Sequence, residues 1–280
     1  MTADEKLAVI AGNLRNAAAD SSRADDIVRG TLYELAELAA SLEDHTGAAD
    51  TARLVIPDDS PEMLAQFCKL YAKYYGDRLS PIRGEEPSDK SDTVAIPEIA
   101  RLTDTVRVLC ENGIELSAEY GDSFASCAED VEYGNSRYVL MPVFDPEEGR
   151  IRSFDKLRVR YGLKIHCILY VPGDNGGEYG YQLCGLGLPD DSVFPHHRVL
   201  FTAETKHDPL KFIDGILLLG AKLASAEIGV GDGVNTVTAV LNTERLGDYD
   251  MRGLLMYMNS AADITIDGCY AEIHHKSKGF

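Results

Sequence analysis

The first half of the chain shows the hydrophobic spacing of amphipathic helices. Between residues 3 and 19, Leu7, Ile10 and Leu14 recur three and four positions apart, which places their side chains on one face of an α-helix. Similar spacing continues over residues 25–42, 61–75 and 97–110, and more weakly over 117–131. Ser60 followed by Pro61 marks a helix start, because Ser is a preferred N-cap and Pro is tolerated in the first turn. Residues 1–133 are therefore predicted to form a helical module.

The second half changes to the pattern of strands separated by turns. Short apolar or alternating segments predict strands over residues 138–144, 156–171, 179–188, 198–204 and 234–241. The first four follow one another as an antiparallel meander. Asp208 and Pro209 open a helix that is apolar most of the way round, which is typical of a helix buried on two sides. A further helix carries Met251, Leu254 and Met258 on one face.

The last apolar segment, residues 264–273, is predicted to be a β-hairpin. In a single regular strand, Ile264 and Ile266 would face one side while Cys269 and Ile273 faced the other. A two-residue turn at Asp267 and Gly268 brings all of them onto one face. We therefore expect a terminal hairpin that lies on the core.

These elements predict an α+β fold with an acidic helical module at residues 1–133 and an antiparallel sheet with two helices at 134–280. Residues 1–133 hold 27 acidic and 12 basic side chains, whereas residues 134–280 hold 19 and 15. Such charge asymmetry suggests two modules with different surfaces. The boundary is soft, since the helices could also pack directly on the sheet as one domain.

The overall charge excludes some classes of partner. The chain has 280 residues and a formal net charge of −19, so its mean field repels polyanions and argues against bulk binding of nucleic acid or an anionic membrane. No apolar run approaches the roughly 20 residues of a membrane span, and from the residues at the N-terminus we expect no secretory signal. The six scattered cysteines fit reduced thiols, and we expect a cytoplasmic protein.

One candidate site is a basic face on the predicted strand 156–171. Basic side chains fall at even positions there, and alternation along a strand would place them on one face. Guanidinium groups on such a face could bind phosphate or carboxylate. The competing interpretation is a solvated face whose cations meet acidic neighbours. The predicted ligand-binding residues are Arg158, Arg160, Lys164 and His166.

Other motifs carry weaker signals. The segment from Asp190 and Asp191 to His196 and His197 holds possible metal ligands, but its spacing matches no known metal motif, and we predict no metal site. The glycines between residues 229 and 233 lie between a predicted helix and a strand, the reverse of a phosphate-binding loop. Cys167 alternates with apolar neighbours and is expected in the core. The sequence matches none of the familiar nucleotide, hydrolase or zinc-finger patterns, and no cofactor is implied.

The leading functional hypothesis is a non-catalytic binding or regulatory protein that engages an anionic small molecule or an acidic partner segment through the basic strand face. An enzyme is the first alternative, with Arg158 and Arg160 positioning a phosphorylated or carboxylated substrate and His166, His196 or His197 transferring a proton. A structural or assembly protein, such as a homo-oligomer, is the second. The acidic surface also fits a high-salt or high-GC source organism.

Overall fold

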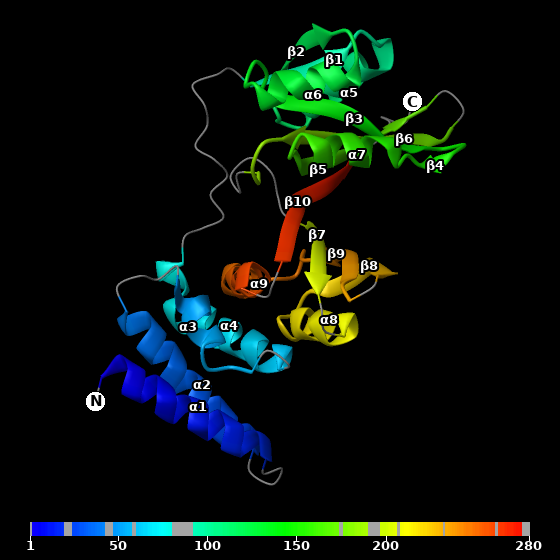
Figure 1. The fold of residues 1–280 in the computed structure, drawn as a ribbon. Coiled ribbons are helices and arrows are strands. Elements are labelled where there is room, and N and C mark those ends of the chain that lie inside the picture. The colour runs from blue at the N-terminus through cyan, green and yellow to red at the C-terminus, as the bar shows by residue number, and fades with distance from the viewer. Residues whose placement is uncertain are drawn as a thin grey trace. The chain divides into compact units, whose positions relative to one another are not determined.

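A computed structural model describes most of the chain, and it divides into two compact units. The described ranges are residues 2–19, 24–42, 47–57, 60–79, 92–173, 176–189, 197–205, 208–231, 233–260 and 263–275. Unit 1 comprises Met1–Pro81 and Phe201–Thr265, and unit 2 comprises Ile82–Leu200 and Ile266–Phe280 (Figure 1). The chain thus passes between the units three times. This division differs from a split into two halves after Tyr133.

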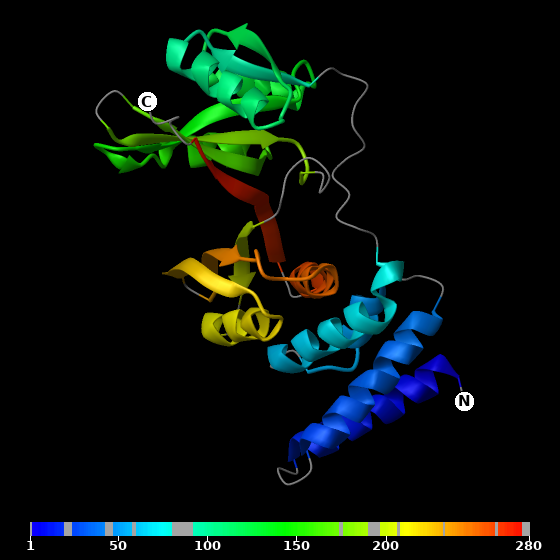
Figure 2. The same cartoon turned by 180° about the vertical axis from the view of Figure 1, so that it is seen from behind.

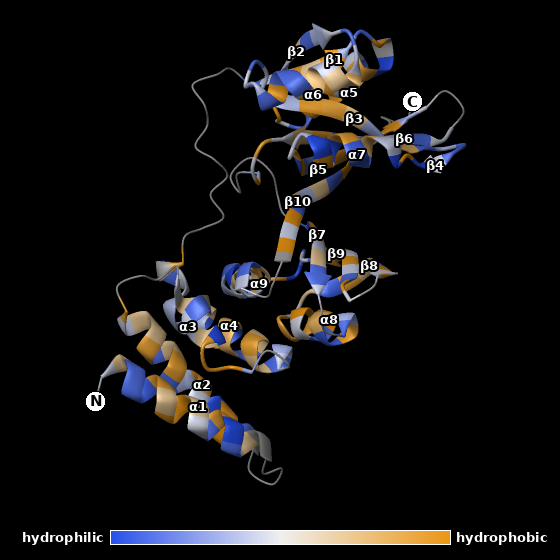
Figure 3. Cartoon of the chain, viewed as in Figure 1, coloured by the Kyte–Doolittle hydropathy of each residue, from blue (hydrophilic) through white to orange (hydrophobic). Residues whose placement is uncertain are grey.

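Unit 1 is mainly helical. Its N-terminal part contains α1 (Ala3–Ala19), α2 (Ala24–Ser41), α3 (Ala48–Arg53), α4 (Pro61–Tyr75) and the short 3₁₀ helix η2 (Gly76–Arg78). Helices α1 and α2 pack side by side (Figure 2), and the hydropathy alternation along both is visible in Figure 3. The predicted helix at residues 3–19 is confirmed, and so are the start and end of α4. None of the helices in the described ranges is long and apolar enough to cross a membrane.

The C-terminal part of unit 1 adds a small sheet and two helices. Helix α8 (Pro209–Leu218) begins as predicted, because the Asp208 side chain accepts a hydrogen bond from the backbone N–H of Leu210 at 2.9 Å. The other elements are β8 (Lys222–Val230), β9 (Asn235–Asn242) and α9 (Asp248–Ser260). Helix α8 contacts α4 as well as β8 and β9, but it is not buried most of the way round, since Leu210 is 59% exposed. With the end of β7 (Arg198–Thr205), the strand order is β7-β9-β8.

Unit 2 is built on a mixed sheet, not on the predicted antiparallel meander. The strand order is β2-β1-β3-β6-β5-β10, in which β1 is parallel to β2 and β3, and β6 is antiparallel to β3 and β5. The α+β class is confirmed. The meander fails because residues 153–160 form a helix between β3 and β5; these two strands are therefore parallel, and β6 lies between them, antiparallel to both. The elements are β1 (Thr93–Pro97), α5 (Ala100–Glu111), β2 (Ser117–Gly121), α6 (Phe124–Glu132), β3 (Tyr138–Asp145), β4 (Gly149–Arg150), α7 (Ser153–Arg160), β5 (Lys164–Pro172) and β6 (Glu178–Gly185).

The two faces of this sheet are covered by different helices. Leu102, Val106 and Leu109 of α5 pack in one apolar cluster with Leu140 of β3 and Leu169 of β5. Helices α6 and α7 lie on the opposite side of the sheet (Figures 1 and 2). The weak helix expected over residues 117–131 is in fact β2 followed by α6, which starts at a capping box formed by Ser123 and Ser126.

The predicted terminal hairpin is wrong, because β10 (Asp263–His274) is one strand. It pairs with β5 in parallel, and the register shifts between Gly268 and Ala271: three steps along β10 match two steps along β5. A bulge of this kind inserts one residue and reverses the alternation of side chains. In the sequence, the apolar residues switch from even to odd positions within this segment, which suggested a turn. A bulge within one strand produces the same switch.

Candidate functional site

The basic face predicted on a strand over residues 156–171 is wrong, because the structure divides this segment between a helix and a strand. Residues 153–160 form helix α7, and only Lys164 and His166 belong to strand β5. Phe154, Leu157 and Tyr161 are spaced three and four apart, so the segment carries a helical pattern as well as alternating cations. Gly162, at φ 63°, ends the helix. Its N–H bonds to Val159 O, and the next N–H bonds to Arg158 O, as in a Schellman motif.

Arg158 is committed to an internal ion pair. Its side chain is 5% exposed, and Nη1 lies 3.2 Å from Oδ1 of Asp267, whose side chain is 9% exposed. The same Nη1 donates to the backbone oxygens of Leu163 and Asp267, each at 3.3 Å. A buried charge must be paired and hydrogen-bonded to be tolerated, and Nη1 supplies these contacts, while the buried Nε has no hydrogen-bond partner among the described residues. This guanidinium therefore ties α7 to β10 within unit 2.

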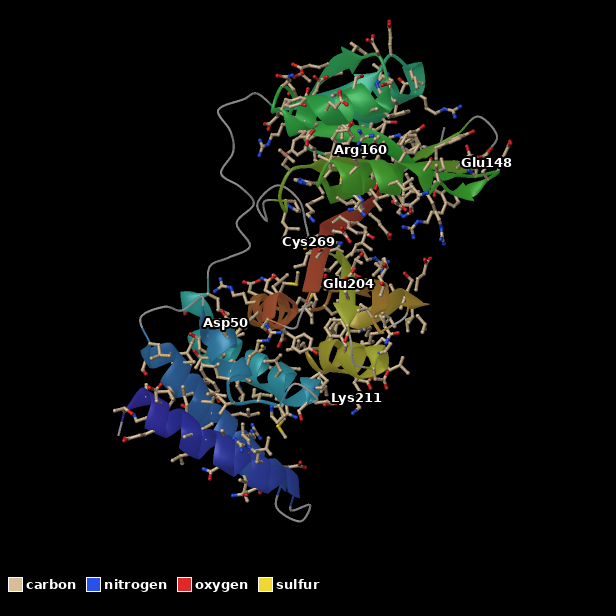
Figure 4. All side chains as sticks on the ribbon, viewed as in Figure 1. Asp50, Glu148, Arg160, Glu204, Lys211 and Cys269 are labelled. Carbon is tan, nitrogen blue, oxygen red and sulfur yellow. The ribbon has the colours of Figure 1, made fainter. Side chains whose placement is uncertain are left out.

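Of the other three predicted residues, Lys164 shares the surroundings of Arg158 and Asp267, whereas Arg160 and His166 lie elsewhere. Arg160 is exposed on α7 (Figure 4), with its guanidinium carbon 5.3 Å from the centre of the Tyr161 ring. Burial lowers the pKa of Lys164, an effect that the nearby Asp267 opposes. His166 is buried, with Nε2 3.3 Å from the Gly187 carbonyl oxygen. The structure does not bring the four side chains together.

The structure supports no binding or catalytic role for the described residues of the other sequence candidates: the possible metal ligands, the glycine-rich segment and Cys167. Asp190, Asp191 and His196 lie outside the described residues, while His197 is exposed and its backbone N–H bonds to Tyr270 O at 3.1 Å. The glycine-rich segment joins strand β8 to strand β9, so it is a hairpin connection and not a helix-to-strand loop. Cys167 is a core residue, 1% exposed, and burial raises its pKa to about 12. Among the described residues, no three His, Cys, Asp or Glu side chains converge as a metal site.

A cavity on the α5 side of unit 2 gathers a different set of functional side chains. Its volume is about 530 Å³. One wall comes from α5, and the other comes from the end of β5 and from the residue after β10. The lining residues are Arg101, Asp104, Thr105, Arg107, Val108, Val171, Pro172, Gly173 and His275. Four of them, at positions 101, 104, 105 and 108, share one face of the helix.

Arg101 is oriented by two aromatic side chains of β6. Its guanidinium carbon lies 4.0 Å from the centre of the Tyr179 ring. Burial raises the pKa of Tyr181, and the charge and hydrogen bond of Arg101 oppose that rise. Gly173 is required beside this ring, because a Cβ there would lie 2.3 Å from a Tyr179 ring carbon. A guanidinium stacked in this way is restricted in orientation at the cavity wall.

The second arginine of the cavity is paired at the surface. Nη2 of Arg107 lies 3.0 Å from Oδ1 of Asp104, and the two side chains are 69% and 63% exposed. Thr105 is fully buried and its hydroxyl donates to Arg101 O at 2.8 Å, which fixes the first turns of α5. On the opposite wall, the backbone N–H of His275 bonds to Tyr170 O at 3.0 Å.

The cavity combines positive charge with an apolar wall. Two arginines face one aspartate, while Val108 and Val171 supply buried apolar surface. In a chain of net charge −19, this is a local reversal of sign. Such an arrangement can bind an anionic group on the arginines and an apolar group against the valines.

The sequence contained only part of the signal for this site. The polar face of residues 97–110 is visible as a helix surface, but nothing in it distinguishes a cavity wall from a solvated face. Val171 and His275 are brought to α5 by the pairing of β5 with β6 and β10. That juxtaposition depends on strand register, which local spacing does not specify.

Comparisons with known proteins identify no family. No protein-family model matches the chain, and no curated protein matches it. Among solved structures, a prephenate dehydratase from Streptococcus mutans aligns with 65% of this chain and 100% of its own, at 13% identity and a TM-score of 0.45. GqqA, described as a novel type of quorum quenching acylase, aligns with 65% of this chain and 95% of its own, at the same identity and TM-score. A prephenate dehydratase from Arthrobacter aurescens, in complex with L-Phe, aligns with 64% and 90%, at 10% identity and a TM-score of 0.45. Similarity at this level does not extend to function.

Proposed function

We propose that this protein binds a small anionic molecule that also carries an apolar group, and that the cavity beside α5 is the binding site. The observation that carries the proposal is the placement of Arg101 and Arg107 beside Val108 and Val171 in one cavity of about 530 Å³. Cavities of roughly 300–1,000 Å³ are typical of small-molecule sites. The proposal keeps the anionic ligand expected from the sequence and moves its site from α7 to α5.

The two arginines have different parts in this proposal. Arg101 is held against Tyr179, so little side-chain freedom is lost when it binds an anion. Arg107 forms an ion pair with Asp104. An anionic ligand must either displace the Asp104 carboxylate from Arg107 or bind beside it. The proposal is limited to binding. Of the histidines in the enzymatic alternative, His166 packs inside the unit and His197 does not line the cavity, while His196 lies outside the described residues.

The test is isothermal titration of the full chain with a matched panel. Phenyl phosphate and benzoate carry both groups, inorganic phosphate carries only the charge, benzyl alcohol carries only the ring, and a glutamate-rich peptide represents an acidic partner. We expect the two amphipathic anions to bind at least tenfold more tightly than the other probes. The double variant Arg101→Gln with Arg107→Gln should lose that binding.

The matched control for the single variant Arg101→Gln is Arg160→Gln, which likewise removes one positive charge, from an exposed position on α7. It should leave the affinity unchanged, because Arg160 does not line the cavity. Equal weakening by the control would show that net charge alone attracts the ligand. Preferential binding of the glutamate-rich peptide would favour the acidic partner instead.

A further inference from the structure

Strand β8 of unit 1 is exposed along its whole length. All nine residues from Lys222 to Val230 are exposed, whereas alternate residues of its neighbour β9 are buried. β8 is the last strand in the order β7-β9-β8, and within the described residues it pairs only with β9. Its outer edge therefore presents backbone N–H and C=O groups to whatever lies beside it.

One face of β8 lies next to the face of β9 that is buried in the apolar core of unit 1. Ile228 lies opposite Val237, and Ala226 lies opposite Ala239; both β9 residues are essentially fully buried. On β8, however, Ile228 is 41% exposed and Val230 is 85% exposed. The apolar face thus extends beyond the part of the sheet that the helices of unit 1 cover.

Strand β8 carries no net charge, unlike the chain as a whole. Its only charged side chains are Lys222 and Glu227, so its nine residues sum to zero in a chain of net charge −19. Two copies of this chain repel each other over most of their surfaces, and a strand without net charge adds nothing to that repulsion where two copies meet. An exposed edge with an apolar face would otherwise be a template for uncontrolled pairing.

We propose that β8 pairs with β8 of a second copy of this chain, antiparallel and about a two-fold axis at Ile228. Ala226 would then lie opposite Val230, a small residue against a larger one, and Glu227 would lie opposite Gly229. An axis at Glu227 would place two carboxylates opposite each other, which destabilises a sheet. An axis at Ala226 would involve the irregularity between Leu223 and Ser225. Two-fold pairing closes both open edges, so assembly stops at the dimer.

The first test is the mass of the full chain in solution by sedimentation or light scattering. We expect a dimer of the 30.6 kDa chain. Ile228→Lys should give a folded monomer, since it places two ammonium groups together on the axis. Leu210→Lys, at a 59% exposed position on α8, is the matched control and should remain dimeric. A wild-type chain that stays monomeric at 100 µM, or a dimer that survives Ile228→Lys, overturns the proposal.

A second test does not depend on the folding of the lysine variant. In a Cys110→Ser background, Ile228→Cys should form an intermolecular disulfide rapidly under mild oxidation, because the two-fold axis brings the residue next to its own copy. Val230→Cys should not, because its copy lies about four residues further along the partner strand. A dimer that crosslinks through Val230→Cys, or through neither position, contradicts the register and the proposed interface.

Discussion

Helices α5 and α7 of unit 2 both carry arginines, but they use them in opposite ways. On α7, Arg158 is buried and bonded to Asp267 and to two backbone oxygens. On α5, Arg101 and Arg107 remain at the surface, where they line a cavity. The comparison teaches that clustered cations in a sequence indicate a binding site only when the fold leaves them accessible. In the denser cluster on α7, Arg158 has a structural role, whereas Arg160 is exposed and does not line the cavity beside α5.

The strongest test of this comparison is the stability of Arg158→Met. Removal of the guanidinium leaves the Asp267 carboxylate buried without its partner, and breaking a buried pair in this way costs about 3–5 kcal/mol. We expect urea unfolding to show a loss of that size. Arg160→Met on the same helix should change the free energy of unfolding by less than about 0.5 kcal/mol, because its side chain is exposed. Similar losses in the two variants would contradict the structural role of Arg158.

A second test uses a buried thiol on the α7 side of the sheet. Burial raises the pKa of Cys184 well above its usual range, an effect that the charge of Arg158 opposes. A thiol with a raised folded-state pKa stabilises the fold fully below its unfolded pKa of about 8.5, and that stability is lost as the pH rises. Between pH 8 and 10, we expect urea unfolding to show a contribution of about 2 kcal/mol to the lost stability.

Cys184→Ala should reduce that pH dependence, whatever its effect on the stability at pH 7. Cys110→Ala, on α5, is the comparison, because Cys110 is only partly buried. If both variants lose the alkaline dependence equally, the buried environment of Cys184 is not its origin.

A third test separates the two cavity arginines. Arg101→Gln should weaken binding of the amphipathic anion about tenfold, the order expected for loss of one charge-assisted hydrogen bond. Asp104→Asn should strengthen binding two- to threefold, because it removes the carboxylate that competes for Arg107. Titration calorimetry at two salt concentrations measures both effects. Weaker binding by Asp104→Asn would show that the carboxylate contacts the ligand.

The smallest expected effect is the coupling energy between Asp104 and Arg107, the ion pair at the surface of α5. A double-mutant cycle on Asp104 and Arg107, with no ligand present, should give a coupling energy below about 1 kcal/mol, since both side chains are mostly exposed. The same cycle on Arg158 and Asp267 should give a larger value. Equal coupling energies would remove the contrast between the two helices.

The sequence was sufficient for elements with one dominant pattern. The helix at residues 3–19 was predictable from its apolar spacing, and α4 and α8 from Ser60 or Asp208 followed by proline. The strand predicted from residue 156 onward was wrong up to residue 163. Cations alternate there with a period of two, while Phe154, Leu157 and Tyr161 follow a helical period. Gly162, which ends α7, was the local signal that could have decided between them.

The remaining errors arose from interactions between distant strands. In β10, a bulge against β5 reversed the side-chain alternation and imitated a turn at Asp267 and Gly268. The cavity could not be predicted because its walls come from α5, from the end of β5 and from His275. Strand pairing and register bring these segments together, and neither is specified by spacing within any one of them.

Ligand binding beside α5 can be observed residue by residue in a methyl-resolved NMR titration of the full chain with phenyl phosphate and benzoate. Val108 and Val171 line the cavity, whereas Val139 is buried in β3 outside its lining. We expect saturable shifts at Val108 and Val171, little change at Val139, and no shifts in the Arg101→Gln, Arg107→Gln double variant. No shift with either anion at 10 mM, or shifts that persist in the double variant, would contradict ligand binding beside α5.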